Sequence, residues 1–436
     1  MSRRLLLAGV VVLFLGGILG AQAPQADAVN TGDTAFILVS AALVMLMTPG
    51  LAFFYGGMVR GKNVLNTLMQ SFVAVAVISV QWILWGYSLG FGPDRGGLVG
   101  TLDWFALSGV GMQPNPDYAP TIPHQTYMIY QGMFAVITPA LITGAIAERM
   151  KFKTYLVFML LWATLVYDPI AHWVWGMGGW LRSAGALDFA GGTVVHISSG
   201  VSALVAALLI GRRRGYPDTP MPPHNLPYTI LGAAILWFGW FGFNAGSAVA
   251  AGALSTGAFI ATNTAAAAAT LGWMAMDWIV KGKPTALGAA SGAVAGLVAI
   301  TPASGYVSPV SSIIIGAAAG CVCFTAVTLR AKKTGIDDSL DVFGVHGVGG
   351  TLGALLTGLF ASKLVNPAGN DGLFFGNAAL LGTQVVAVAA CWAYAGVVTF
   401  VLLKVLDRVM GLRVEDHEEE EGLDVSQHGE TAYSVE

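Results

Sequence analysis

Two histidines stand alone in otherwise apolar segments, His196 in GGTVVHISSGVSALVAALLIG and His346 in FGVHGVGGTLGALLTGLFA. An ionisable side chain at membrane depth is costly, so it ordinarily faces a cavity or a partner and marks a transport path or a proton relay. Burial and a neighbouring charge both disfavour the imidazolium, so a close pair shares one proton and titrates as a unit. No Cys, Asp or Glu stands at ligand spacing to complete a metal site. We predict a proton-sharing pair; two separate core histidines are the alternative.

The elements that must position these histidines are membrane-spanning helices. Of the 436 residues, 55% are hydrophobic and 10% charged, whereas a soluble protein carries about 25% charged residues. The apolar residues come in runs of about 20, which is the length that crosses a bilayer as a helix, and the 57 glycines favour close helix packing. We predict an all-α integral membrane protein with eleven transmembrane helices, near 34–58, 65–91, 126–147, 154–172, 193–211, 227–246, 257–280, 285–302, 309–330, 344–361 and 380–408.

The N-terminus and the basic residues predict the orientation. Residues 1–28 combine Arg3, Arg4, an apolar stretch and small residues, which is typical of a signal peptide cleaved after Ala23 or Ala28; an extra anchor helix is the alternative. With the mature N-terminus outside, 16 Lys and Arg residues fall in cytoplasmic connections and 3 in outer loops, in agreement with the positive-inside rule. We expect a membrane domain over 29–408, with a cytoplasmic tail over 409–436, in the cytoplasmic (inner) membrane of a bacterium.

The eleven spans divide into five, five and one C-terminal helix. The fifth span follows LDFAGG and carries His196, and the tenth follows LDVFG and carries His346. Because five is odd, the second half must be inverted relative to the first, an arrangement that places sites near the membrane midplane in many transporters. The outer loop over 92–125 is long and rich in Gly, Pro and Asp, and the acidic tail is, by composition, a mobile solvated terminus.

Polar and aromatic residues gather at the outer ends of spans 4 to 6. Asp188 precedes the fifth span, where its carboxylate can cap the backbone N–H groups near Gly191 and Gly192; it also attracts cations, and direct cation coordination is the weaker alternative. The clusters AHWVWGMGGW (171–180) and WFGFNAGSA (240–248) are either interfacial aromatic belts or the walls of a vestibule. Gly and Asn among the aromatics favour the vestibule.

These segments resemble one family along nearly the whole chain from about residue 34. TPGLAFFYGGMVRGKN, YQGMFAVITPALITGAIAER, GALDFAGGTVVHI, GWFGFNAGSA, DVFGVHGVGG and the tail GLRVEDHEEEEGLDVSQHGETAYS are similar to the Amt/Mep/Rh ammonium transporters, and to the bacterial Amt branch above all. Tyr130 stands where that family more often has Phe, a difference that bears on the polarity of the vestibule and not on the mechanism.

The resemblance implies a role for each matching residue. The outer ammonium-recruitment site is matched by Trp175, Ser247, Phe134 and Asp188, the phenyl gate by Phe134 and Phe243, the pore-lining twin histidines and proton relay by His196 and His346, and a further pore-lining aromatic by Trp240.

The resemblance also implies an activity and partners. We expect ammonium to be recruited at the outer face and deprotonated, ammonia to cross the pore, and the proton to move separately, so that transport is electrogenic. An ammonium sensor and an electroneutral Rh-like ammonia channel are the alternatives. An intramembrane enzyme is disfavoured, because no nucleophile or metal constellation accompanies the histidines. No cofactor or nucleic acid is expected; a homotrimer is, with a PII-type signal protein binding at the tail.

Overall fold

The computed structural model describes residues 29–433, so the expected signal peptide lies outside the described residues. Each of the eleven expected spans is helical, and nine helical segments of the described chain are long and apolar enough to cross a membrane. Of the other two, α12 is apolar but only 15 residues long, and α11 is 29 residues long but is not among the nine. The spans are formed by α2 (Thr31–Met58), α3 (Val64–Gln81) with α4 (Tyr87–Phe91), α5 (His124–Ile146), α6 (Phe152–Trp162) with α7 (Asp168–Trp175), α9 (Ser198–Ile210), α10 (Leu226–Ala245), α11 (Ala253–Lys281), α12 (Ala286–Ile300), α13 (Pro309–Lys333), α14 (Val348–Phe360) and α15 (Ala378–Met410).

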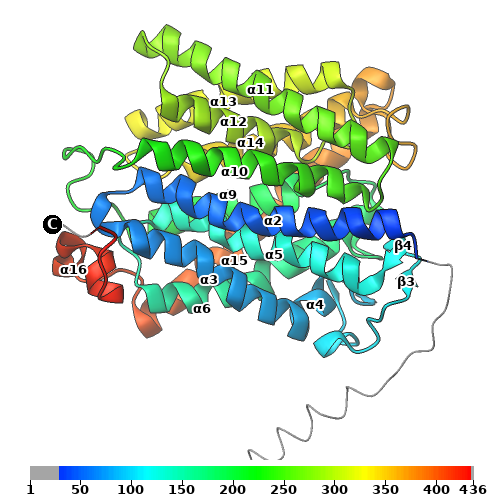
Figure 1. The fold of residues 1–436 in the computed structure, drawn as a ribbon, viewed down its shortest axis with the longest axis horizontal. Coiled ribbons are helices and arrows are strands. Elements are labelled where there is room, and N and C mark those ends of the chain that lie inside the picture. The colour runs from blue at the N-terminus through cyan, green and yellow to red at the C-terminus, as the bar shows by residue number, and fades with distance from the viewer. Residues whose placement is uncertain (1–28, 434–436) are drawn as a thin grey trace, which may run out of the picture.

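The helices lie side by side in one bundle whose two ends differ (Figure 1). One end, here called the strand end, carries two small antiparallel sheets, β1 (Asp94–Arg95) with β2 (Val99–Gly100) and β3 (Pro114–Asn115) with β4 (Ala119–Pro123). These strands lie within the segment expected to be a plain loop. The other end, the tail end, carries the C-terminal helix α16 (Asp416–Glu421).

The two halves of the chain run in opposite directions. Helix α2 begins at the strand end, where the Asn30 N–H donates to the Thr121 carbonyl of β4. Helix α10, the first span of the second half, begins beside the other end of α2, because the Asn225 N–H donates to the Gly57 carbonyl. The predicted inversion is therefore confirmed.

Turns wider than an α-helical turn interrupt four spans. These π-type turns are η2 (Trp82–Gly86), η4 (Ala163–Tyr167), η5 (Gly192–Ile197) and η7 (Phe343–Gly347). Such turns are rare and occur often at functional sites, because they displace side chains from the regular helical positions. The turns η5 and η7 carry His196 and His346 and begin the spans that continue as α9 and α14.

The helix that follows each of the turns η5 and η7 packs on the other turn through glycine. A Cβ added to Gly200 of α9 would lie 2.1 Å from the Gly347 nitrogen of η7, and one added to Gly350 of α14 would lie 2.9 Å from the Gly192 carbonyl oxygen of η5. Only glycine leaves room for backbones this close, as expected for helix packing in membranes. These two contacts bring the histidine turns together.

The tail is folded, which corrects the interpretation from its composition. Residues 416–428 form α16 and the turn η9 (Asp424–His428), and Glu419 and Asp424 are buried. The Leu423 N–H donates to Asn63, and the Asn66 N–H donates to Asp424. These contacts attach the acidic segment to the start of α3.

Candidate functional site

The two histidines meet at the centre of the bundle. Nδ1 of His346 lies 3.2 Å from Nδ1 of His196, the ring centroids are 5.3 Å apart, and both side chains are buried. At this distance one Nδ1 carries the hydrogen and the other accepts it. Nε2 of His196 is buried and has no partner among the described residues. The predicted pair is thus in place, and it can hold a single bridging proton while a second polar group approaches His196.

A series of aromatic rings leads from the strand end to these histidines. The Trp175 and Phe134 ring centroids are 5.9 Å apart and edge-to-face, and those of Phe134 and Phe243 are 4.2 Å apart. Phe243 lies 6.1 Å from the His196 ring, and Trp240 stacks on the same ring at 5.5 Å. The passage at the histidines is narrow, with a cavity of about 10 Å³, which is room for roughly one water-sized sphere.

Above the rings the chain encloses open space at the strand end. A cavity of about 130 Å³ is lined by Trp175, Phe134 and Ser247, and a larger one of about 720 Å³ adjoins it and also reaches Asp188. The Ser247 hydroxyl donates to the Phe243 carbonyl, so its oxygen keeps lone pairs for a further donor. The aromatic clusters therefore line a hollow, and the vestibule interpretation of the sequence is the one that the geometry favours.

The hydroxyl of Tyr130 is occupied by the backbone. It donates to the carbonyls of Gly242 and Phe243, each at 2.9 Å, and lies 3.2 Å from the Ser247 hydroxyl. The side chain is fully buried. Tyr130 therefore fixes the end of α10 that carries Phe243 and Ser247, and it does not add a free polar group to the vestibule as its identity suggested.

Asp188 caps the start of the His196 segment. Its carboxylate accepts the N–H groups of Gly191, Gly192 and Thr193, each at 2.7 Å, and the Thr193 hydroxyl. Burial raises the pKa of Asp188, and the hydrogen bonds from Thr193, Gly191 and Gly192 oppose that rise. Both carboxylate oxygens accept these bonds, as the capping interpretation predicts. Asp188 also borders the larger cavity, so its negative charge acts on the vestibule.

The second half repeats this arrangement with an acid that sequence reasoning missed. Asp338 accepts the N–H groups of Val342 and Phe343 at the start of η7. Asp188 and Asp338 each stand eight residues before their histidine. This equal spacing could have identified Asp338 from the sequence. Asp341 obscured it, because the segment LDVFG around Asp341 resembles the segment LDFAGG around Asp188.

Other residues near the site were also missed. Thr301 accepts the Trp240 indole N–H at 2.9 Å and so fixes the ring beside His196. Asp117 and Arg182 line the smaller vestibule cavity. The sequence does not show that Asp117 and Arg182 share a cavity, because they are 65 positions apart along the chain.

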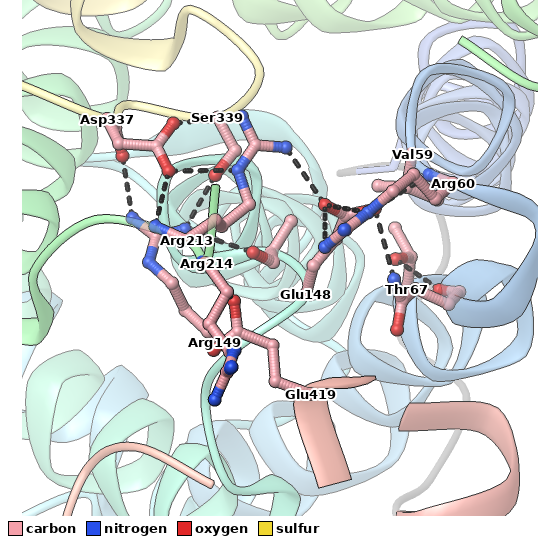
Figure 2. A network of polar contacts seen from close by, with 12 residues as sticks. Val59, Arg60, Thr67, Glu148, Arg149, Arg213, Arg214, Asp337, Ser339 and Glu419 are labelled. Atoms are coloured by element: carbon pink, nitrogen blue, oxygen red, sulfur yellow. Dashed lines mark hydrogen bonds and ion pairs between the residues drawn. The ribbon is translucent and has the colours of Figure 1, made fainter. Parts of the chain in front are cut away.

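At the tail end, a network of charged groups joins the loops between spans (Figure 2). Arg213 bonds to Asp337 and Glu148, and Arg60 also pairs with Glu148. The Arg214 N–H and the Arg413 side chain both bond to Glu419 of α16. Burial raises the pKa of Glu148, and the charges of Arg213 and Arg60 more than offset this, so that its pKa lies below the ordinary value. The tail is therefore attached by charge to the same loops that join the spans.

Comparison with known proteins gives one consistent result. A family model described as the Ammonium Transporter Family matches residues 35–433. The chain is 56% identical to an ammonium transporter of Bacillus subtilis, over 92% of this chain and 98% of that protein, and 50% identical to the ammonium transporter Amt1 of Archaeoglobus fulgidus, over 93% and 100%. The crystal structure of Saccharomyces cerevisiae Mep2 superposes with a TM-score of 0.86 at 39% identity, covering 93% of this chain and 92% of that one. The matched range contains every residue of the passage described above, and the chain belongs to the ammonium transporter family, a family of transporters and not of enzymes.

Proposed function

We propose that this protein is an electrogenic ammonium transporter that strips a proton from ammonium at the vestibule and conducts ammonia past the two histidines. The observation that carries the proposal is the unbroken series from an open cavity, through Trp175, Phe134 and Phe243, to the His196–His346 pair. In this series Trp175, Ser247, Phe134 and Asp188 recruit ammonium, and Phe134 with Phe243 forms the gate.

The magnitudes favour deprotonation at the vestibule. A cation over aromatic faces gains roughly 2 kcal/mol when it is desolvated, whereas an isolated ion in a dry, low-dielectric passage has an idealised Born cost on the order of 20 kcal/mol. For an amine whose pKa is 2–3 units above neutral pH, loss of the proton costs about 3–4 kcal/mol. Ammonia is therefore the species that crosses, and the stacked phenyl rings must rotate to admit it, because their centroids lie 4.2 Å apart.

The histidine pair then serves both cargoes. Neutral imidazole offers one donor and one acceptor, so the pair can bind ammonia in an otherwise apolar passage that Trp240 also lines. The bridging hydrogen between the two Nδ1 atoms and the free Nε2 of His196 form the core of a proton relay. The released proton moves by this relay, separately from ammonia.

We place the strand end outside the cell and the tail end in the cytoplasm of a bacterium. The basic residues Arg60, Arg149, Arg213 and Arg214 gather at the tail end (Figure 2), as the positive-inside rule requires. Residues 1–28 are then a cleaved signal peptide, 29–408 the transport domain and 409–436 a regulatory tail. The proposal includes a homotrimer and a PII-type signal protein that binds beside the docked tail.

The proposal is tested by electrical recording from purified protein in a supported membrane. Wild-type protein is expected to give an ammonium-evoked current, and the joint variant His196→Ala and His346→Ala is expected to give none. His417→Ala, on the exposed face of α16, is the matched control and keeps the current. An unchanged current in the double variant excludes the relay, and ammonia flux without any current in the wild type points to an electroneutral channel.

A further inference from the structure

One acid inside the membrane, Asp168, has no charged partner within residues 29–433. Asp168 begins α7, seven residues before Trp175 and thus about 10 Å below the vestibule. Its side chain is fully buried. One carboxyl oxygen, Oδ2, accepts the Gln81 amide N–H at 2.7 Å, and the other, Oδ1, has no partner among the described residues.

Two further buried oxygens in the same region lack partners. They are Oε1 of Gln81 and the hydroxyl of Tyr167, the residue next to Asp168. The Gln81 amide is completed on its other side by the Thr164 hydroxyl, to which it donates at 3.3 Å. Buried polar atoms in native proteins are paired in the large majority of cases, with protein or with ordered water. Asp168 Oδ1 and Gln81 Oε1 belong to side chains that are joined by a hydrogen bond, so two unpaired oxygens at this point indicate a site with something bound.

The local helix geometry supports a built site. The turns η2 and η4, both of π type, directly adjoin Gln81 and Asp168, since η2 follows Gln81 and η4 ends at Tyr167. A Cβ added to Gly86 of η2 would lie 2.5 Å from Gln81 Oε1, so the glycine leaves the space that the amide occupies. Both spans therefore depart from regular helix where these polar groups meet.

The nearest candidates for a charge partner are already occupied. His172, one helical turn beyond Asp168, has Nε2 2.9 Å from Asp94 and Nδ1 3.1 Å from the Gly90 carbonyl. By contrast Asp277, also buried in a span, has Lys281 Nζ at 2.8 Å. A buried carboxylate without such a cation costs several kcal/mol, and taking up a proton is the less costly state.

We infer that Asp168 and Gln81 form a proton-holding site beside the pore, in which the Asp168 carboxyl is a neutral acid and one water molecule bridges Asp168 Oδ1 and Gln81 Oε1. Because Oδ2 accepts the Gln81 N–H, the acid hydrogen lies on Oδ1 and is donated to the water, which in turn donates one of its own hydrogens to Gln81 Oε1. The site is separate from the histidine pair, and its occupancy does not depend on how ammonium crosses the membrane.

Infrared difference spectroscopy on the full-length protein tests the protonation. Wild type minus Asp168→Asn is expected to show one carboxylic-acid C=O band that moves to lower frequency in D₂O. Wild type minus Asp277→Asn, the matched buried acid, is expected to show no such band. Absence of the band at neutral pH overturns the inference, as does its appearance only after removal of Na⁺, K⁺ and ammonium, because the site is then a cation site.

A further measurement keeps the test independent of folding. A high-resolution experimental map is expected to show one water within hydrogen-bonding distance of Asp168 Oδ1 and Gln81 Oε1. Empty density there overturns the water.

Discussion

At the residue scale, the contact between His196 and His346 makes the two rings one chemical unit. Their Nδ1 atoms are 3.2 Å apart, so the tautomer of one ring dictates that of the other. Both rings stay neutral when the hydrogen moves from one Nδ1 to the other only if Nε2 of the donating ring gains a proton and Nε2 of the receiving ring loses one. Any substitution of one histidine therefore also changes what the other can donate or accept.

Trp175 is the residue whose loss should affect ammonium recruitment most simply. It lines both outer cavities and meets Phe134 edge-to-face. Trp175→Leu removes a cation–π contact worth roughly 2 kcal/mol, so the ammonium concentration for half-maximal current is expected to rise about tenfold or more. Trp278→Leu, on the exposed face of α11, is the control and should leave the current unchanged. Equal affinity in both variants contradicts the assignment.

Asp188 should matter for stability as well as for charge. Its carboxylate accepts four strong hydrogen bonds, three of them from backbone N–H groups. Each such bond to a charged group contributes about 1.5–3 kcal/mol, although not additively. Asp188→Ala is expected to lower the unfolding free energy by about 3 kcal/mol or more and Asp188→Asn by less, measured by thermal unfolding in detergent. The exposed Asp103→Ala is the control, and an Asn variant as unstable as Ala contradicts the cap.

The sequence predicted the types of site residue but not all of their partners. The family motifs identified the residues that lie together in the passage, namely the two histidines, Phe134, Phe243 and Trp175. The backbone bonds of Tyr130 and the Thr301–Trp240 bond join residues more than 60 positions apart. No local pattern encodes such a contact, so only the fold reveals that Tyr130 is structural.

At the element scale, the close contact of Gly200 in α9 with Gly347 of η7 determines whether the histidines can meet. Gly200→Ala would place a methyl group 2.1 Å from the Gly347 nitrogen. Overpacking in a close-packed core costs typically 1–3 kcal/mol, and backbone cannot yield as a side chain can. We expect a lower unfolding temperature and a loss of most current. Gly257→Ala, in α11 with open space at its Cβ, is the matched control and should be neutral or slightly stabilising.

The spans were predictable and their interruptions were not. Apolar runs of membrane length recovered all eleven helical segments, because lipid imposes that length on any spanning helix. The π-type turns at 82–86, 163–167, 192–197 and 343–347 left no signature in the apolar pattern, since one wide turn changes neither composition nor length. Composition wrongly predicted a mobile tail for a related reason. Glu419 bonds to Arg214, which is 205 positions away, and to Arg413, which no motif distinguishes.

At the scale of the whole molecule, the tail and the interspan loops form one charged assembly. Glu419 accepts the Arg214 N–H and pairs with Arg413, and its side chain is buried. Glu419→Ala is expected to release α16, so that limited trypsin digestion cuts the tail at least several-fold faster. The exposed neighbour Glu421→Ala is the control. Equal cleavage of the two variants contradicts docking through Glu419.

The loss of folded-state stability at acid pH should depend on the same charged assembly. Glu148 and Asp337 are buried against Arg213; burial raises the pKa of each, and the arginines more than offset it, so both pKa values lie below their ordinary ranges. Carboxyls of this kind stabilise the folded state above about pH 4, and that contribution is lost as the pH falls through their lowered values. Arg213→Gln leaves Asp337 without its ion-pair partner and Glu148 with Arg60 alone, and is expected to cost about 3–5 kcal/mol at neutral pH. Because protonation removes the charge of these acids, the difference in unfolding temperature between wild type and Arg213→Gln should shrink as the pH is lowered below about 4.

The control is Arg214→Gln. The Arg214 side chain is 42% exposed, so this variant should differ little from wild type in unfolding temperature at every pH. A constant Arg213 difference across the acid range would mean that the residue stabilises by packing and not by its charge.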